Sequence, residues 1–396
     1  MSEPDAKRQP TARVVKVPTS TVRPGESRNY AAGRVSADVR SPRPLKVAVV
    51  GATGAVGEEM RRLLQERAFP IEGPPVLVAS ERSAGRRLNF AGDEVEVRRL
   101  APEVFDDVDL ALFSAGREVS RLWAPVAAER GAVVVDNSSA WRREPDVPLV
   151  VSEVNPHELS HRPRGIIANP NCTTMVLMVA VKPLHDAFGL EAMVTTSYQS
   201  AGGAGQKGMS ELLEQTAKLL DDPAMLRRDG RAVATTVSPS QFSKVIAFNV
   251  LAHCGRFTDD RYTDEEWKLV HESRRILELP DLQVSPTCVR VPVVVGHAIA
   301  ARLSFRRPVE VDAALDVLRA APGLLVEDGT GQEDGQPLAY PTPLESAGRD
   351  EVFVGRVRRD LADSNAVNLF VVGDNLLKGA ALNAVQLAEL VALELS

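Results

Sequence analysis

Cysteine is scarce in this chain of 396 residues: only Cys172, Cys254 and Cys288 occur, and no two form a CxxC pair. A disulfide framework or a cysteine-built zinc site is therefore not expected, no metal is predicted, and the cytoplasm is the expected location. No apolar run approaches the roughly 18 residues of a membrane span. The N-terminus also lacks the apolar core of a secretory signal. The formal net charge of -6 gives no general reason to expect nucleic acid or an anionic membrane as a partner.

The first 44 residues lack a sustained hydrophobic period and are rich in Pro, Ser, Thr and Arg. They hold 9 Lys and Arg against 4 Asp and Glu, so this stretch is basic while the remainder is acidic. We predict a disordered tail over 1–44. A contact arm for a partner or a neighbouring subunit is the alternative.

Residues 45–171 alternate apolar strands with helical segments. The strand that starts at Leu45 runs into a glycine turn and an amphipathic helix, and further strands are expected over 74–80, 108–116 and 131–139. Continuous apolar strands that alternate with helices indicate a parallel sheet covered on both faces. The sequence thus predicts an α/β, Rossmann-like dinucleotide-binding domain.

Residues 172–374 have a different pattern, which predicts an α+β domain on a mixed or antiparallel sheet. Helical periods run over 173–188, 264–277 and 308–321, and β-rich segments are expected over 191–200, 243–251, 287–305 and 351–360. The last segment, 376–395, is a strongly periodic helix.

The glycine turn has the spacing GxxGxxG, in Gly51, Gly54 and Gly57, rather than the dinucleotide fingerprint GxGxxG. Glycines here permit a tight turn and a close approach of backbone N–H groups to a phosphate at the helix N-terminus; the alternative is that they only turn the chain. The second strand ends in Ser80, Glu81, Arg82 and Ser83. Hydroxyl and guanidinium groups suit the 2′-phosphate of NADP, whereas Glu81 would suit the ribose of NAD. We favour NADP.

Cys172 directly precedes a helix that Thr173 or Thr174 is expected to begin. A helix N-terminus lowers the pKa of a thiol and so favours a nucleophilic thiolate. Cys288, inside an apolar strand, fits the commoner role of a small buried hydrophobe. Cys254 is left unassigned.

A cysteine nucleophile needs a base, and His297 is the best placed of the six histidines. It follows a glycine in a long β segment that also carries Arg290, so both side chains can reach one cleft. By itself His297 is equally compatible with a base and with a structural residue. Arg290 in an apolar strand needs an anionic partner, for which a substrate carboxylate is the natural choice.

These residues occur in motifs that resemble the aspartate-β-semialdehyde dehydrogenase family from about Leu45 to the C-terminus. The motifs stand in family order: GATGAVG, ALFSAG, VVDNSSAWR, NPNCTT, SYQS, YTDEEWK, TCVRVPVVVGH and DNLLKGAALNAVQ. The resemblance implies an NADPH-dependent reduction of L-aspartyl-4-phosphate to aspartate semialdehyde and phosphate, which feeds lysine, methionine and threonine synthesis. It also implies a homodimer, and it divides the chain into an NADP-binding domain (45–171 and 375–396) and a catalytic and dimerisation domain (172–374).

The resemblance assigns a role to each matching residue. Cys172 would form a thioacyl intermediate, His297 would be the acid/base, and Gln199 would orient the substrate carbonyl. Substrate would be bound through its α-carboxylate, α-amino group and phosphate by Arg290, Glu265, Arg142 and Lys268, with Asn137 or Asn171. The cofactor would be held by Gly51, Thr53, Gly54, Ala55, Val56, Ser80, Arg82, Ser83, Gly202 and Asn375.

Three departures from the family pattern favour a possible change in substrate preference. Gly202 stands where the family usually has serine, Ala252 stands where proline is expected, and the 44-residue extension is unusual. The alternatives are a related acyl-phosphate reductase of the N-acetylglutamyl-phosphate type or a paralogue with an altered substrate, and a catalytically weak dinucleotide-binding protein with a regulatory or assembly role.

Overall fold

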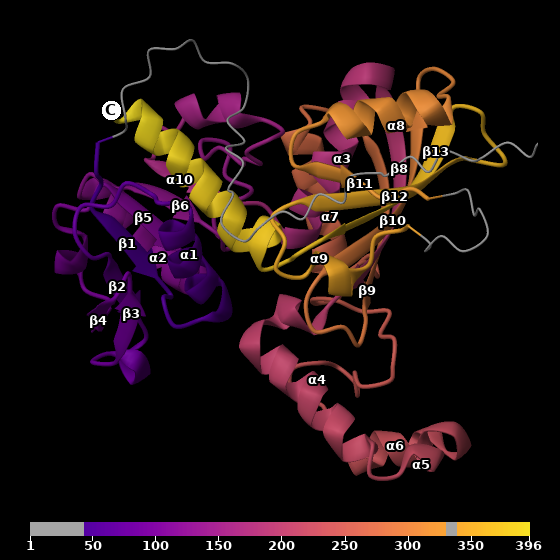
Figure 1. The fold of residues 1–396 in the computed structure, drawn as a ribbon, viewed down its shortest axis with the longest axis horizontal. Coiled ribbons are helices and arrows are strands. Elements are labelled where there is room, and N and C mark those ends of the chain that lie inside the picture. Colours follow the sequence, from indigo (N-terminus) through magenta and orange to yellow (C-terminus); the bar gives the residue numbers. More distant parts are fainter. Residues whose placement is uncertain (1–42, 330–338) are drawn as a thin grey trace, which may run out of the picture. The chain divides into compact units, whose positions relative to one another are not determined.

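The computed structural model describes residues 43–329 and 339–396, so the tail predicted over 1–44 lies almost wholly outside the described residues. The described chain forms two sheets, with strand orders β3-β4-β2-β1-β5-β6-β7 and β11-β12-β13-β10-β8-β9 (Figure 1). None of the described helices is long and apolar enough to cross a membrane.

The first sheet confirms the predicted parallel architecture. All its neighbouring strands pair in parallel except β3 with β4. Its strands are β1 (Val47–Val50), β2 (Val76–Ala79), β3 (Arg87–Phe90), β4 (Asp93–Arg99), β5 (Leu110–Phe113), β6 (Val133–Asp136) and β7 (Ile166–Ala168). The helices of this region are α1 (Ala55–Glu66) and α2 (Arg117–Glu129), with 3-10 turns at Glu81–Ser83, Pro102–Phe105 and Pro156–Ser160. Strands β1 and β5 are buried throughout, which explains their unbroken apolar sequence.

The second sheet is mixed, as the sequence predicted. Its strands β8 and β9 pair in parallel, whereas β10 runs antiparallel to both β8 and β13. The strands are β8 (Leu190–Gln199), β9 (Gln283–Arg290), β10 (His297–Phe305), β11 (Leu324–Val326), β12 (Val352–Arg359) and β13 (Ala366–Gly373). The helices are α3 (Cys172–Phe188), α4 (Gly205–Leu219), α5 (Pro223–Arg228), α6 (Gly230–Thr236), α7 (Asp264–Ile276), α8 (Val311–Ala320) and α9 (Pro343–Ser346), with a 3-10 turn at Ala201–Ala204.

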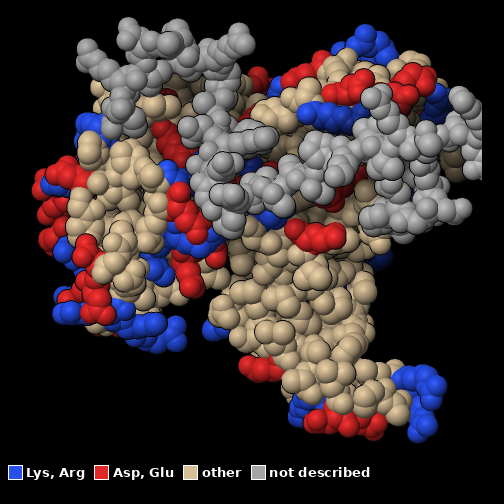
Figure 2. All heavy atoms as spheres, in the orientation of Figure 1, with Lys and Arg blue, Asp and Glu red and all other residues tan. Residues whose placement is uncertain are grey.

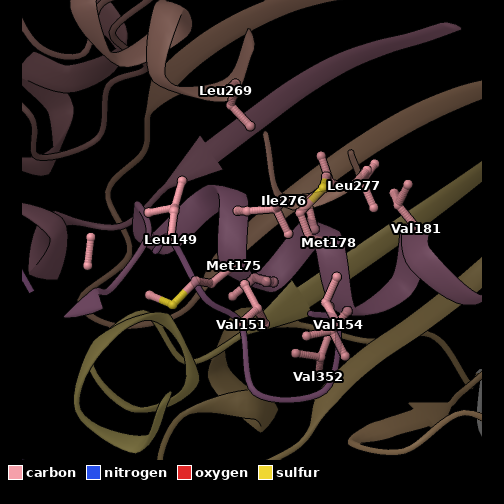
Figure 3. Close-up of a cluster of buried hydrophobic side chains, with 14 of the residues drawn as sticks. Leu149, Val151, Val154, Met175, Met178, Val181, Leu269, Ile276, Leu277 and Val352 are labelled. Atoms are coloured by element: carbon pink, nitrogen blue, oxygen red, sulfur yellow. The ribbon is translucent and has the colours of Figure 1, made fainter. Parts of the chain in front are cut away.

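Helix α3 is the centre of a hydrophobic core. Figure 3 shows Met175 and Met178 of α3 among side chains of α7 and of the loop around Val151. Helix α3 is apolar on nearly every face and buried over most of its length, so packing on all sides holds it in place. Full burial of each methionine contributes about 1.5–3 kcal/mol. The residue that begins α3, Cys172, is thereby held on a rigid element.

The C-terminal segment packs on the first sheet. It begins with a π-helix at Leu377–Ala381 and continues as α10 (Leu382–Glu394), whose buried residues cluster with those of α1 and β1 (Figure 1). The domain boundaries at 171 and 375 stay a prediction.

Two β segments differ from the prediction. The apolar stretch 243–251 is not a strand: Ile246 and Ala247 are buried, but their amides donate to Oε1 of Gln215 at 3.0 and 3.3 Å. The stretch is apolar because it packs against α4. A buried strand would need the same apolar residues, so the sequence pattern does not distinguish the two. The stretch 287–305 is divided into β9 and β10 by a turn that ends at Gly296, whose φ is +95°.

Candidate active site

Three strand ends meet at one edge of the second sheet. Gln199, the last residue of β8, stands opposite Arg290, the last residue of β9. His297 begins β10 on the other side of β8, next to the pairing of Ala298 with Tyr198. Strand order therefore explains how Arg290 and His297, seven residues apart, come to flank Gln199 on separate strands.

Cys172 lies at the same edge as the first residue of α3. The side chain of Asn171 caps this helix, since its Oδ1 accepts the amides of Thr173 and Thr174 at 3.0 and 3.3 Å. Sγ of Cys172 lies 3.3 Å from Nε2 of His297. The structure thus brings the predicted nucleophile and the predicted base into contact.

The other ring nitrogen of His297 faces Ser200. The Ser200 amide donates to Nδ1 at 3.1 Å, and Ser200 Oγ lies 3.2 Å from the same atom. Ser200 Oγ donates to Oδ1 of Asn375 at 2.9 Å, which also accepts the amide of Gly296 at 2.9 Å. Because the Ser200 amide donates to Nδ1, this nitrogen is an acceptor here, and the neutral ring carries its proton on Nε2, which faces Sγ of Cys172. Ser200 is a site residue that the sequence prediction missed.

The protonation of the Cys172–His297 pair corrects one prediction. Burial, followed by the charge of Glu265, raises the pKa of the Cys172 thiol to about 11, against the opposing effect of Arg142 and Arg290. The helix start was expected to lower this pKa, but loss of hydration outweighs it. Burial and then Arg290 lower the pKa of His297 to about 3. At neutral pH the pair is therefore a neutral thiol beside a neutral imidazole.

Glu265 forms the centre of a polar cluster next to Cys172. Its Oε1 accepts from Nδ2 of Asn171 at 2.8 Å and from Nε2 of Gln199 at 3.4 Å, and its Oε2 accepts from Nζ of Lys268 at 2.8 Å. Burial opposes ionisation of this carboxyl, but Lys268 and these hydrogen bonds lower its pKa to about 2. Four predicted residues from three motifs, Asn171, Gln199, Glu265 and Lys268, thus meet at one carboxylate.

Arg142 is anchored by the protein on one side. Its Nε donates to the carbonyl of Asn169 at 2.9 Å, its Nη2 to the carbonyl of Asn137 at 2.8 Å, and its Nη1 to Oε1 of Glu272 at 3.2 Å. One N–H bond on each terminal nitrogen remains for a ligand. Glu272, which the sequence prediction missed, also accepts the Asn171 amide at 2.6 Å through Oε2. Glu265, Lys268 and Glu272 are spaced i, i+3 and i+7 in α7, a signal that helical periodicity could have revealed.

Arg290 is half-buried and points toward the same loop. Its Nη1 donates to the carbonyl of Ser200 at 2.7 Å, and its guanidinium lies over the ring of Phe242 at 5.7 Å. Gly203 lies against it: a Cβ at this position would be 2.6 Å from Nη1 of Arg290 and 3.2 Å from Nε2 of His297. The sequence prediction missed this requirement for glycine.

Gly202, the departure from the family pattern, lies beside Asn375. A Cβ at Gly202 would meet the carbonyl oxygen of Val294 at 2.9 Å and Nδ2 of Asn375 at 3.3 Å. Backbone therefore occupies the space that a serine side chain would need here.

The glycine turn after β1 has the features of a phosphate cradle. Gly51 has a φ of +88°, and a Cβ on it would lie 2.3 Å from the carbonyl oxygen of Ser114. No side chain caps α1, which leaves the amides of Ala55 and Val56 available for an anion. Thr53 Oγ1 lies 3.5 Å from Ser83 Oγ, so this turn meets the one after β2. These residues fit a dinucleotide phosphate.

The turn after β2 presents polar groups to solvent. Ser80 and Arg82 are exposed and Ser83 is half-buried. In the described part of the chain the Arg82 guanidinium forms no ion pair, so it is free to meet a 2′-phosphate.

The other two cysteines are buried and free. Burial raises the pKa of Cys254 to about 12 and raises that of Cys288 as well. Neither approaches His297 as Cys172 does.

Comparison with known proteins agrees with this geometry. Residues 46–162 match the family model "Semialdehyde dehydrogenase, NAD binding domain", and residues 181–378 match "Semialdehyde dehydrogenase, dimerisation domain". A two-sheet protein with a cysteine–histidine pair and both of these domains is a semialdehyde dehydrogenase.

Individual relatives show which kind of semialdehyde dehydrogenase the chain resembles. Aspartate-semialdehyde dehydrogenase of Streptomyces akiyoshiensis is 51% identical over 353 residues, which cover 89% of this chain and 99% of the relative. The crystal structure of aspartate semialdehyde dehydrogenase II complexed with ASA from Vibrio cholerae has a TM-score of 0.81 at 45% identity, covering 88% and 98% of the two chains. The enzyme with NADP from Candida albicans has a TM-score of 0.67 at 26% identity, covering 89% and 100%. The chain belongs to the aspartate-semialdehyde dehydrogenase family.

Proposed function

We propose that the chain catalyses the NADPH-dependent reductive dephosphorylation of L-aspartyl-4-phosphate to aspartate semialdehyde, through a thioester on Cys172. The observation that carries the proposal is the 3.3 Å contact between Sγ of Cys172 and Nε2 of His297, beside the cluster of Glu265, Lys268 and Gln199. An acyl phosphate needs a soft nucleophile and cationic groups for the phosphate, and this site offers both.

In the first step Sγ attacks the acyl carbon while its proton passes to Nε2 of His297. For Nε2 to accept this proton, the ring's own proton must lie on Nδ1, where Ser200 Oγ accepts it in place of the donor contact from the Ser200 amide, while the Ser200 proton is directed to Asn375. The two free N–H bonds of Arg142, with Lys268, hold the phosphate as its bond to the acyl carbon breaks.

Substrate orientation is assigned to three side chains. The Glu265 carboxylate, ionised at neutral pH, attracts an α-ammonium group, and Arg290 binds the α-carboxylate. Gln199 positions the carbonyl through its amide. An acetylated amine would gain nothing from Glu265, which favours the aspartyl substrate over the N-acetylglutamyl one.

The second step is reduction of the thioester, for which bound NADPH would supply the hydride. Gly51, Thr53, Gly54, Ala55 and Val56 would hold its pyrophosphate, and Ser80, Arg82 and Ser83 its 2′-phosphate. Asn375 and Gly202 would lie on the nicotinamide side. His297 then returns the proton to the oxygen as the thiolate leaves.

A homodimer is supported by the apolar surface of the second domain. Leu213 and Leu220 are 56% and 54% exposed, and Phe248 and Val250 are 51% and 62% exposed. Figure 2 shows that the surface over α4 carries few charged side chains in this view. An apolar surface of this kind is typical of a protein interface. The free cysteines are compatible with the cytoplasmic location, which stays a prediction.

The test is NADP reduction with aspartate semialdehyde and phosphate, for wild type and Cys172→Ala. Turnover by the wild type that Cys172→Ala abolishes supports the proposal. Turnover only with N-acetylglutamate semialdehyde would assign the related reductase, and tight NADP binding without either turnover would make the chain a binding protein.

A further inference from the structure

A cavity of about 440 Å³ opens beside Arg142 and Lys268, on the outer side of the polar cluster. Its wall comes from the start of α2, from the loop after β6 and from α7. Four cationic side chains line it: Arg117, Arg142, Arg143 and Lys268. Arg142 and Lys268, which hold the phosphate in the proposed reaction, are only two of these four.

The four cations differ in how they are paired. Arg142 is bonded to Glu272, and Lys268 is bonded to Glu265, so the inner pair is held in place by buried carboxylates. Arg117 and Arg143 are exposed, and no ion pair to either is present within 43–329 and 339–396. The outer pair is therefore charged and lines the cavity without an ion-pair partner of its own, although the carboxylates of Asp264 and Glu272 line the same cavity.

The charge of Arg143 acts on His271, another residue of the cavity wall. His271 lines the cavity and stacks on Trp267 with ring centroids 5.1 Å apart. Burial, then the charges of Arg143 and Arg274, lower the pKa of His271. The charge of Arg143 therefore opposes protonation of His271, and an anion bound at Arg143 would reduce this effect.

We propose that Arg117 and Arg143 form an outer anion site, which receives a phosphate dianion at the cavity mouth and exchanges it with the inner site of Arg142 and Lys268. The inference rests on the proposed function, because the inner site is the one that holds the phosphate during the reaction. Guanidinium groups suit phosphate through bidentate hydrogen bonds, and the hydroxyl of Ser139 lines the same space. Since exposed charges act over about 8 Å at physiological salt, the outer pair attracts the anion before the buried pair can bind it.

The experiment measures binding of inorganic phosphate, without turnover, by calorimetry. Arg117→Ala and Arg143→Ala should each raise the Kd for phosphate about two- to fivefold, as expected for exposed charge pairs. Arg130→Ala, which removes an exposed arginine at the far end of α2, is the matched control and should leave the Kd unchanged. The affinity for NADP should be the same in all four proteins.

A second readout is the NMR titration of His271, assigned with a His271→Gln variant. Saturating phosphate should raise the pKa of His271 in the wild type and raise it less in Arg143→Ala. Unchanged phosphate affinity in Arg117→Ala and Arg143→Ala would overturn the proposal, and so would a His271 pKa that phosphate does not move. If Arg117→Ala and Arg143→Ala lose affinity for NADP and not for phosphate, the proposal is also overturned, because the two arginines then bind the cofactor.

The variant Arg142→Ala distinguishes a wrong outer anion site from a wrong proposed function. If Arg142→Ala loses phosphate binding while the outer variants do not, the inner site stands and the outer site is wrong. If the wild type binds no phosphate at all, the proposed function fails with it.

Discussion

Sγ of Cys172 lies 3.3 Å from Nε2 of His297, and both groups are neutral at pH 7 in the absence of substrate. The nucleophile is therefore activated by proton transfer to His297 during attack, and not by a resting thiolate. This arrangement protects a half-buried thiol from adventitious oxidation, because oxidation follows thiolate character and exposure.

Alkylation of Cys172 tests this protonation state. Because the thiol pKa is raised to about 11, the rate constant for reaction with iodoacetamide should keep rising with pH beyond pH 9. Glu265→Gln removes a charge that disfavours the thiolate, so its rate at pH 8 should exceed that of the wild type. Cys172→Ala supplies the background. A wild-type rate that reaches its plateau below pH 8 contradicts the prediction.

Arg82→Ala tests cofactor preference. If the guanidinium meets the 2′-phosphate, the substitution should raise the Kd for NADPH about tenfold, which corresponds to one charge-assisted hydrogen bond, and leave that for NADH nearly unchanged. Arg87→Ala, in β3 and paired with Glu94, is the control. Equal weakening of both cofactors would reject the role of Arg82.

Gly203→Ala should impair catalysis without unfolding the protein. The added Cβ would lie 2.6 Å from Nη1 of Arg290 and 3.2 Å from Nε2 of His297, so one of these side chains must move. We expect kcat/KM to fall by about 10–100-fold, because small misplacements of reacting groups have effects of this size. Gly230→Ala is the matched control, because a Cβ there meets no atom within 4 Å. A Gly203→Ala enzyme with wild-type kcat/KM is the result that rejects this prediction.

Lys378→Met tests a buried ion pair that joins the C-terminal segment to the loop after β6. Lys378 is 1% exposed and donates to Glu153, Ser152, Asn383 and Gln386. The substitution leaves the Glu153 carboxylate buried without its counter-ion, at a cost of about 3–5 kcal/mol in urea unfolding. Adding Glu153→Gln should restore much of the loss. The prediction is wrong if the single variant is as stable as the wild type.

The acid side of the stability profile should depend on His297. Its pKa is lowered to about 3 in the folded protein from a usual value of 6.5, so the unfolded chain takes up the proton first. Stability is complete above pH 6.5 and is lost as the pH falls from 6.5 toward 3. His297→Asn should show a shallower decline in thermal midpoint over this range, whereas His157→Asn on the surface should follow the wild type. Parallel curves for His297→Asn and wild type would exclude the effect.

Local sequence pattern was sufficient to predict much of the fold and to select the candidate site residues. Alternating strands and helices predicted the parallel sheet, because that periodicity is written into neighbouring residues. The strand predicted over 243–251 was wrong, because burial against α4 requires apolar residues whether or not the backbone is extended. Cys172, Glu265 and the pair of Arg290 and His297 were chosen from three motifs. Strand order brings the ends of β8, β9 and β10 together, and the starts of α3 and α7 contact the same place.

By itself the sequence determined which side chains are available for chemistry and on which elements they lie. Only the tertiary structure decided the raised pKa of Cys172, the need for glycine at 203, the contact of Ser200 with His297 and the convergence of Arg117 and Arg143 on one cavity. Hydration, Coulomb energy and steric space depend on distances between residues far apart in the chain, whereas motifs and periodicity record only near neighbours.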